Sequence, residues 1–289
     1  MNEALSYLTH IAAQSLLKEV GTTPKPGLVD RHDNGAHKDM CHDTFVASTG
    51  AIVPFLSQMA ETGFTWKESP DRLFPAIRPI GVEAEKAMFQ ATHGVNTHKG
   101  LIFSLGIIMA AAGYEYQKTG QFHSQSILLL CRDMTDTYLE QDFAAIDPAF
   151  PKTHGERLYI KYGCKGIRGE VQSGFAHIRD ISLPLIHSLH KQELEENQMF
   201  LHVLLELMAQ VEDTNVLIRT DPETAEYVKQ EARRILPLAR AGSWNQLYEA
   251  ITFMNQDFIR KNISPGGCAD LLAVTIFLWL LEQYKGGFQ

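Results

Sequence analysis

The spacing of apolar residues is helical along nearly the whole chain, and this pattern limits the fold more than any other feature. Leu5, Leu8, Ala12 and Leu16 recur every three or four residues, for example. Only residues 127–130 form a short apolar run typical of a strand, and they lie inside a longer helical pattern. Because strands and helices do not alternate, we predict a single compact all-α domain over residues 1–289. The expected helices cover residues 5–20, 44–61, 79–91, 101–118, 124–141, 171–189, 201–211, 222–238, 244–260 and 267–284.

The net charge of the chain limits the classes of ligand that it can be expected to bind. Lysine and arginine total 26 against 34 aspartates and glutamates, which gives a net charge of −8 with neutral histidines. A nucleic-acid partner is not expected, because binding a polyanion requires a broad basic surface. A smaller anionic ligand would have to be held by a few local cations, by helix termini or by a metal ion.

The sequence also predicts a cytoplasmic protein without a membrane segment. The longest apolar stretches, residues 101–114 and 271–281, are shorter than the roughly 20 residues that span a bilayer. Residues 1–20 lack the layout of a signal peptide. The four cysteines are far apart and form no Cys-x-x-Cys pair, which favours reduced thiols over a disulfide framework.

Polar segments between the expected helices are the candidate functional loops, because binding groups often collect on loops held by a rigid scaffold. In the first segment, two prolines stiffen residues 23–31, which can present Lys25, Asp30 and Arg31 to a ligand or serve as a solvated connector. Asn34-Gly35 predicts a turn with positive φ.

The segment 93–100 leads directly into an apolar helix. Thr97 is the expected N-cap, which would leave free amide groups and the positive end of the helix dipole beside His98 and Lys99. Such a site suits a phosphate, although a capped helix with exposed polar residues fits as well. Of Glu83 and Glu85 on the preceding helix, at most one should face this site.

Two further segments are rich in glycine. Residues 163–169 have a glycine at every third position, which permits close backbone approach to a ligand but also suits a flexible surface loop. In the segment before the last helix, Ser264 is the expected N-cap and Pro265 the first helical residue. Gly266 and Gly267 follow, and these weak helix formers would be explained if a ligand approached the backbone.

Carboxylates and other oxygen donors provide candidate metal ligands. The run Glu212-Asp213-Thr214-Asn215 suits Mg²⁺, but Asp213 would serve equally well as the N-cap of a following helix. Asp270 lies at the polar edge of an apolar helix and faces either solvent or a site. His37 and Cys41 are one helical turn apart, a spacing compatible with zinc, but no further ligand cluster accompanies them.

Taken in order, these segments resemble the triphosphoribosyl-dephospho-CoA synthase family. The resemblance covers most of the chain and is weakest over residues 143–162. The strings that carry it are Thr23-Pro24-Lys25-Pro26-Gly27-Leu28-Val29-Asp30-Arg31, Asn34-Gly35-Ala36-His37-Lys38-Asp39-Met40, Arg78-Pro79-Ile80-Gly81, residues 94–106, Arg168-Gly169-Glu170, Asp213-Thr214-Asn215-Val216 and residues 264–272.

The resemblance implies an all-α enzyme that moves the triphosphoribosyl group of ATP onto the ribose 2′-hydroxyl of 3′-dephospho-CoA and releases adenine. The product is the precursor of the citrate lyase prosthetic group, and a related branch serves malonate decarboxylase. The resemblance also implies Mg²⁺ on the triphosphate and a downstream transferase that loads the product onto an acyl carrier protein. A homodimer is compatible with the many apolar helix faces.

Within this family, the chemistry suggests a role for each polar group. Transfer at C1′ passes through an oxocarbenium-like transition state that nearby carboxylates stabilise, and the incoming hydroxyl needs a general base. We expect Asp39, Glu170 or Asp30 to be catalytic. We expect Mg²⁺ ligands or ribose-stabilising groups at Glu85, Asp213 and Asp270, and nucleotide or phosphate contacts at Lys25, Arg31, Asn96, His98, Lys99 and Arg168.

Two other functions fit the same residues. One is a helical Mg²⁺-dependent hydrolase, in which water replaces the acceptor hydroxyl. The other is a non-catalytic nucleotide-binding partner of the lyase machinery. Release of adenine with and without dephospho-CoA separates these functions from the synthase.

Overall fold

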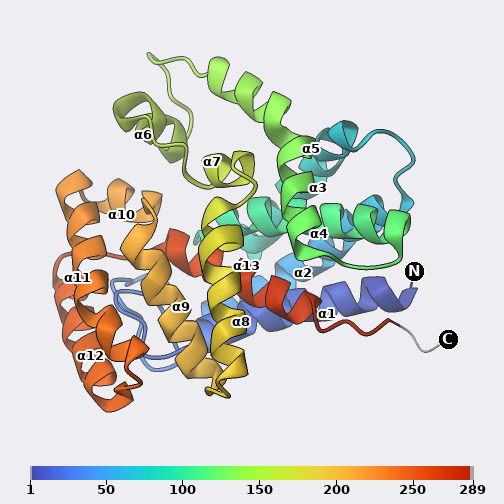
Figure 1. Cartoon of the computed structure of the whole chain (residues 1–289). Helices are drawn as coiled ribbons and strands as arrows, with labels where there is room; N and C mark the ends of the chain where they lie inside the picture. The colour runs from blue at the N-terminus through green and yellow to red at the C-terminus, as the bar shows by residue number, and fades with distance from the viewer. Residues whose placement is uncertain (1, 287–289) are drawn as a thin grey trace.

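The computed structural model describes residues 2–286, and within this range it contains helices and no strand. The all-α prediction is therefore confirmed. Figure 1 shows the helices gathered around a shared centre. They are α1 (Asn2–Gly21), α2 (His42–Thr65), α3 (Leu73–Ala91), α4 (Lys99–Thr119), α5 (Ser124–Ala144), α6 (His154–Tyr162), α7 (Gly166–Gln172), α8 (Leu183–Lys191), α9 (Glu196–Gln210), α10 (Thr214–Arg219), α11 (Pro222–Arg240), α12 (Trp244–Arg260) and α13 (Gly266–Leu281), with short helical turns η1 (Pro70–Arg72) and η2 (Ile178–Ser182).

The centre of the molecule is formed by α4 and α13. Every residue of α13 from Leu271 to Leu281 is buried, as is every residue of α4 from Ser104 to Gly113. A helix that is apolar on all sides is stable only when other helices surround it. Here α1, α2, α3 and α5 pack along one side of this pair, and α8, α9 and α10 contact α13 from the other (Figure 1). One continuous hydrophobic core results.

Two glycines allow a close contact between α2 and α4. A side chain on Gly63 of α2 would place its first carbon 2.0 Å from the carbonyl oxygen of Ala110 in α4. A side chain on Gly113 of α4 would likewise lie 2.2 Å from the carbonyl oxygen of Ala60. Only glycine permits this backbone approach, which holds α4 firmly against α2.

The predicted long helices are present, although α3 and α9 begin at Leu73 and Glu196, before the expected residues 79 and 201, and one predicted helix is interrupted. The interval 171–189 was expected to be one helix, but the structure breaks it between α7 and η2. At the break, Gly174 and Phe175 have φ values of 67° and 54°, which no α-helix contains. The apolar period continues across the break, so periodicity alone did not reveal it.

Short helices also occupy parts of the polar segments. Helix α7 begins inside the glycine-rich segment 163–169, where no helix was predicted, and α10 follows Asp213, as the N-cap alternative for that residue required. In addition, α6 lies in the stretch where the family resemblance was weakest, and no helix was predicted there. Each of these helices has fewer than ten residues, which leaves too few periodic positions to detect.

No helix within residues 2–286 has both the length and the apolar character that crossing a membrane requires. Long helices instead end at the polar loops. The N-termini of α4 and α13 and the segment between α1 and α2 meet at one place, and this meeting point is the candidate site.

Candidate functional site

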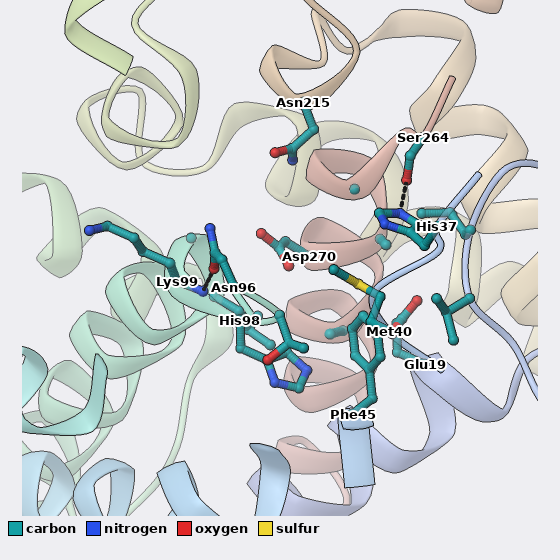
Figure 2. Close-up of a pocket in the computed structure, with 18 of the residues that line it drawn as sticks. Glu19, His37, Met40, Phe45, Asn96, His98, Lys99, Asn215, Ser264 and Asp270 are labelled. Atoms are coloured by element: carbon teal, nitrogen blue, oxygen red, sulfur yellow. Dashed lines mark hydrogen bonds between the residues drawn. The ribbon is translucent and has the colours of Figure 1, made fainter. Parts of the chain in front are cut away.

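The first cavity has a volume of about 330 Å³ and is lined by the segment between α1 and α2, the start of α4, the start of α13 and part of α10. Figure 2 shows polar side chains that converge on it from all these elements. Two long helices point their N-termini toward this space, so their dipoles favour an anionic ligand.

A buried ion pair forms one wall of the first cavity. Lys25 is 1% exposed, and its ammonium group contacts the Glu19 carboxylate and donates a hydrogen bond of 2.9 Å to the Glu19 carbonyl oxygen. Burial raises the pKa of Glu19, and the positive charge of Lys25 partly opposes that shift. Lys25 was expected to bind phosphate, and the structure gives it an internal partner at the cavity wall.

Glu19 was not among the predicted site residues. The signal for it was present, because Glu19 follows Leu16 at the apolar spacing of α1 and so occupies a core position. A carboxylate at such a position requires a partner, since an uncompensated buried charge is costly.

Asp30 shapes the loop. Its carboxylate accepts hydrogen bonds from the Thr23 hydroxyl at 3.0 Å and from the backbone N–H groups of Lys25, His32 and Asp33 at 2.7–2.9 Å. Asp30 was expected to be catalytic, but it lines neither this cavity nor the second one described below. These four bonds hold the stiff loop in place.

The structure also shows the Asn34-Gly35 turn and the position of Arg31 in this loop. The Asn34-Gly35 turn is as predicted, since Gly35 has a φ of 56°. Arg31 is exposed and lies beside Gly21 at the end of α1, outside the first cavity, although it was expected to contact a nucleotide.

A histidine and a serine that were not assigned to the nucleotide site meet in the cavity. His37 Nε2 lies 2.8 Å from the Ser264 hydroxyl, and its Nδ1 lies 3.5 Å from the Arg219 guanidinium and 3.8 Å from Asp39 (Figure 2). Burial lowers the pKa of His37, and the charge of Arg219 lowers it further. Both effects favour the neutral imidazole, and the nearby Asp39 carboxylate partly opposes them. Asp39, an expected base, lines the same cavity and is largely exposed.

The spacing of His37 and Cys41 is compatible with a pair of zinc ligands, although the sequence offers no further ligands beside them. In the part of the chain that the structure describes, no group of three or more His, Cys, Asp or Glu side chains could hold a metal ion. Cys41 instead precedes α2, where its N–H donates to the Thr44 hydroxyl at 3.1 Å.

At the start of α4, Thr97 is not the N-cap as predicted. The helix begins at Lys99 after His98, and the Asn96 side chain accepts the Lys99 N–H at 3.2 Å (Figure 2). Thr97 donates to the Ser48 hydroxyl at 2.7 Å, and that hydroxyl lies 2.6 Å from His98 Nδ1. Burial, with a smaller effect of nearby Lys25, lowers the pKa of His98 to about 3, so His98 lines the cavity as a neutral group.

Lys99 and Glu85 were expected to bind phosphate and metal respectively, and they form an ion pair of 2.8 Å at the edge of the first cavity. Lys99 lines the cavity and is half exposed, so it can turn toward a ligand. Glu83 pairs with Lys86, and neither glutamate lines either cavity, which is within the expectation that at most one of them would face the site.

A second cavity of about 350 Å³ adjoins the first and is lined by α7, residues 173–177, the start of α10 and the start of α13. In this cavity, the Glu170 carboxylate accepts a hydrogen bond of 3.0 Å from the backbone N–H of His177. The same carboxylate lies 2.7 Å from Nδ1 of the His177 ring. This contact raises the pKa of His177. Arg168, although only two residues from Glu170, lies outside both cavities with its guanidinium 5.9 Å from the Phe143 ring centre.

Asp213 joins two helices. One oxygen caps α10 by accepting the Asn215 N–H at 2.8 Å, and the other accepts the Cys268 N–H of α13 at 2.8 Å. The N-cap alternative for Asp213 is therefore the one observed. Burial raises the pKa of this carboxyl, and the hydrogen bonds partly oppose the shift.

The glycines at the start of α13 are explained by the same contact. A side chain on Gly267 would lie 3.1 Å from both Asp213 oxygens, and one on Gly266 would lie 3.1 Å from the Asn215 amide. The close approach that these glycines permit is therefore to side chains of the protein itself.

Asp270 lies on the boundary between the two cavities and lines both of them. It projects from α13 into the space between Asn96 and His37 (Figure 2). Its carboxylate makes no hydrogen bond or ion pair with any residue that the structure describes. Burial raises its pKa well above the usual value, and the negative charges of Glu19 and Asp213 add to this shift. A side chain on Gly100 would lie 2.7 Å from Asp270 Oδ2, so glycine at that position leaves the carboxylate its room.

Comparison with known proteins gives a consistent result. The family described as ATP:dephospho-CoA triphosphoribosyl transferase matches residues 5–288. A protein of Streptococcus pyogenes serotype M3 is 40% identical over 290 residues, covering 96% of this chain and 98% of its own. One of Streptococcus mutans serotype c is 38% identical over 294 residues, covering 97% and 98%. Both are named probable 2-(5″-triphosphoribosyl)-3′-dephosphocoenzyme-A synthase. No solved structure matches the chain significantly.

Proposed function

Because the chain belongs to the ATP:dephospho-CoA triphosphoribosyl transferase family, we propose that its two adjoining cavities are the active site of that transfer. The enzyme moves the triphosphoribosyl group of ATP to the ribose 2′-hydroxyl of 3′-dephospho-CoA and releases adenine. The observation that carries this proposal is the first cavity, in which cations and carboxylates lie together at the N-termini of α4 and α13.

The chemistry fits these side chains. Breaking the bond between C1′ and adenine leaves positive charge on the ribose, and carboxylates beside it stabilise that charge. Glu19, Asp39 and Asp270 provide carboxyl groups in the first cavity. No phosphorus–oxygen bond breaks, so the triphosphate serves to position the ribose, and Lys99 and Arg219 provide cations for it.

The predicted residues divide according to their positions. Of the phosphate contacts, Lys99 has the accessible charge, Lys25 acts from within its ion pair with Glu19, and Asn96 and His98 act as neutral groups. Arg31, Arg168 and Asp30 lie outside both cavities, so we assign them no contact with the reacting atoms.

Magnesium requires a separate argument. Glu85 is paired with Lys99, both oxygens of Asp213 accept backbone N–H groups, and only Asp270 is free of such contacts. These three side chains do not form a common protein site, and the described residues hold no other such group. We propose that Mg²⁺ enters on the ATP triphosphate, since it commonly retains water and phosphate ligands and needs few protein ligands.

In the cell, the product would be loaded onto an acyl carrier protein of citrate lyase by a downstream transferase. We place the enzyme in the cytoplasm, where its four free thiols would stay reduced. A homodimer is proposed for it as well, and light scattering of the purified protein tests that point.

One assay tests the function. The protein is incubated with ATP and Mg²⁺, with and without 3′-dephospho-CoA, while free adenine and the product mass are followed. We expect adenine and a triphosphoribosyl-dephospho-CoA product in equal amounts, and only when dephospho-CoA is present. Equal adenine release without the acceptor would indicate a hydrolase, and ATP binding without adenine release would indicate a nucleotide-binding partner.

A further inference from the structure

The two cavities share one wall, and their linings differ in charge. Gly100, Asn215 and Asp270 line both, so a ligand in one cavity lies next to a ligand in the other. Transfer between two substrates requires this arrangement, because the acceptor oxygen must come within about 3–3.5 Å of the reacting carbon.

Charge decides which substrate each cavity suits. In the first cavity, the cations Lys25, Lys99 and Arg219 accompany its three carboxyl groups. Among the described residues that line the second cavity there is no lysine or arginine, and its acidic residues are Glu170, Glu212, Asp213 and Asp270. A triphosphate would be repelled there, whereas ribose hydroxyls donate well to carboxylates.

Four acidic groups near the boundary already have contacts. Glu19 is bound to Lys25, Glu170 is bound to His177, and Asp213 is bound to backbone N–H groups of α10 and α13. The fourth, Asp39, lies 3.8 Å from His37 and is mostly exposed. Glu212 is exposed and lines only the second cavity. Asp270 differs from all five, because it is half-buried, has no partner among the described residues and borders both cavities.

We propose that the first cavity holds the triphosphoribosyl part of ATP, that the second holds the adenosine ribose of dephospho-CoA, and that Asp270 between them is the general base. This inference rests on the proposed function and adds the place of each substrate. It also replaces Asp39 and Glu170 as candidates for the base.

The step balances. The Asp270 carboxylate takes the proton of the acceptor 2′-hydroxyl while the bond from that oxygen to C1′ forms. The bond from C1′ to adenine N9 breaks, and its electron pair leaves with adenine, which takes a proton from water. Asp270 then returns its proton to water, so no net proton is consumed.

Substitution of Asp270 tests the base. Asp270→Asn keeps the size and removes the proton acceptor, so kcat should fall about 10²–10⁴-fold while KM for both substrates stays within about threefold. Asp270→Glu should recover part of kcat. Recovery of Asp270→Asn by raised Mg²⁺ would identify a metal ligand and overturn the proposal, as would unchanged kcat.

A second pair of variants tests the subsites. Ala176→Leu fills the second cavity and should raise KM for dephospho-CoA at least tenfold with little change for ATP. Lys99→Met should raise KM for ATP about tenfold with little change for dephospho-CoA. Lys191→Met, an exposed charge change on α8, is the matched control and should alter neither value. The opposite pattern of KM changes would refute the assignment.

Calorimetry of ATP and dephospho-CoA binding provides a readout that does not require turnover. If Ala176→Leu fails to fold, as judged by circular dichroism, Ala176→Val makes the same test with a smaller change. Different results would refute the two proposals. If the wild-type protein forms no product, the proposed function is wrong. If the wild-type protein is active but the variants show the wrong pattern of KM changes, only the placement of the substrates is wrong.

Discussion

The buried pair of Lys25 and Glu19 makes a sharp prediction for Lys25→Met. Lys25 is 1% exposed and the Glu19 side chain is 7% exposed, so removal of the ammonium group leaves a carboxylate in the interior without its partner. The Glu19 carbonyl oxygen also loses a hydrogen bond from Lys25 but still accepts the Thr22 N–H at 3.1 Å. The penalty therefore comes mainly from the carboxylate.

The magnitude follows from this burial. Breaking a buried pair by removing one partner costs about 3–5 kcal/mol of unfolding free energy. At about 2–4 °C per kcal/mol, the melting temperature should fall by about 10 °C. The double variant Lys25→Met with Glu19→Gln removes both charges and should recover most of that loss, to within about 2 kcal/mol of wild type.

The pH dependence gives an independent check. Burial raises the pKa of Glu19 above its ordinary value of 4.5, and Lys25→Met removes the charge that opposes this shift. A carboxyl whose pKa is raised on folding favours the folded state below its unfolded pKa, and that contribution is lost as pH rises through the folded pKa. The deficit of Lys25→Met should therefore be larger at pH 7.5 than at pH 5.

Urea denaturation of the wild type, both single variants and the double variant at the two pH values measures all of these quantities. The reasoning would be refuted if Lys25→Met lost less than about 1 kcal/mol or if its deficit did not depend on pH. A stable Lys25→Met variant with a raised KM for ATP would show instead that Lys25 acts chiefly on the triphosphate.

Three further predictions concern other residues of the site. Asp213→Ala removes the caps of two helices and should lower the unfolding free energy by about 2–4 kcal/mol in urea denaturation; a change below about 1 kcal/mol would contradict the capping role. Gly100→Ala should displace the Asp270 carboxylate, lowering kcat about 100-fold without lowering the melting temperature; full activity would mean that Asp270 does not need its present position. Glu170→Gln should lower the pKa of His177, followed by NMR; since that pKa is raised on folding, the pair should stabilise the wild type below about pH 6.5 and less as pH rises through the folded value.

Local sequence signals identified most of the scaffold. The helices at 124–144 and 244–260 begin where the apolar period predicted, because propensity, period and flanking polar residues agree there. The exceptions are α6 and α7, which are too short for a period to show, and the break at Gly174 and Phe175, where two residues of positive φ interrupt the helix.

Motifs located the site segments but not the partners of their side chains. Lys25, Asp39, His98 and Lys99 were selected from loops, and all of them line the first cavity. Glu19 was missed because it lies in the regular helix α1 and not in a polar loop. Only the packing of α1 against the other elements brings it to the first cavity.

The sequence alone determined the all-α architecture, the acidic charge balance and the segments that surround the site, because each of these depends on residue type and local spacing. Only the tertiary structure decided which carboxylates are already bound. Asp30, Asp213 and Asp270 look alike in sequence, but the first two accept backbone N–H groups and the third has no partner among the described residues. That difference depends on where α10 and α13 meet, which is a matter of long-range packing that no local pattern records.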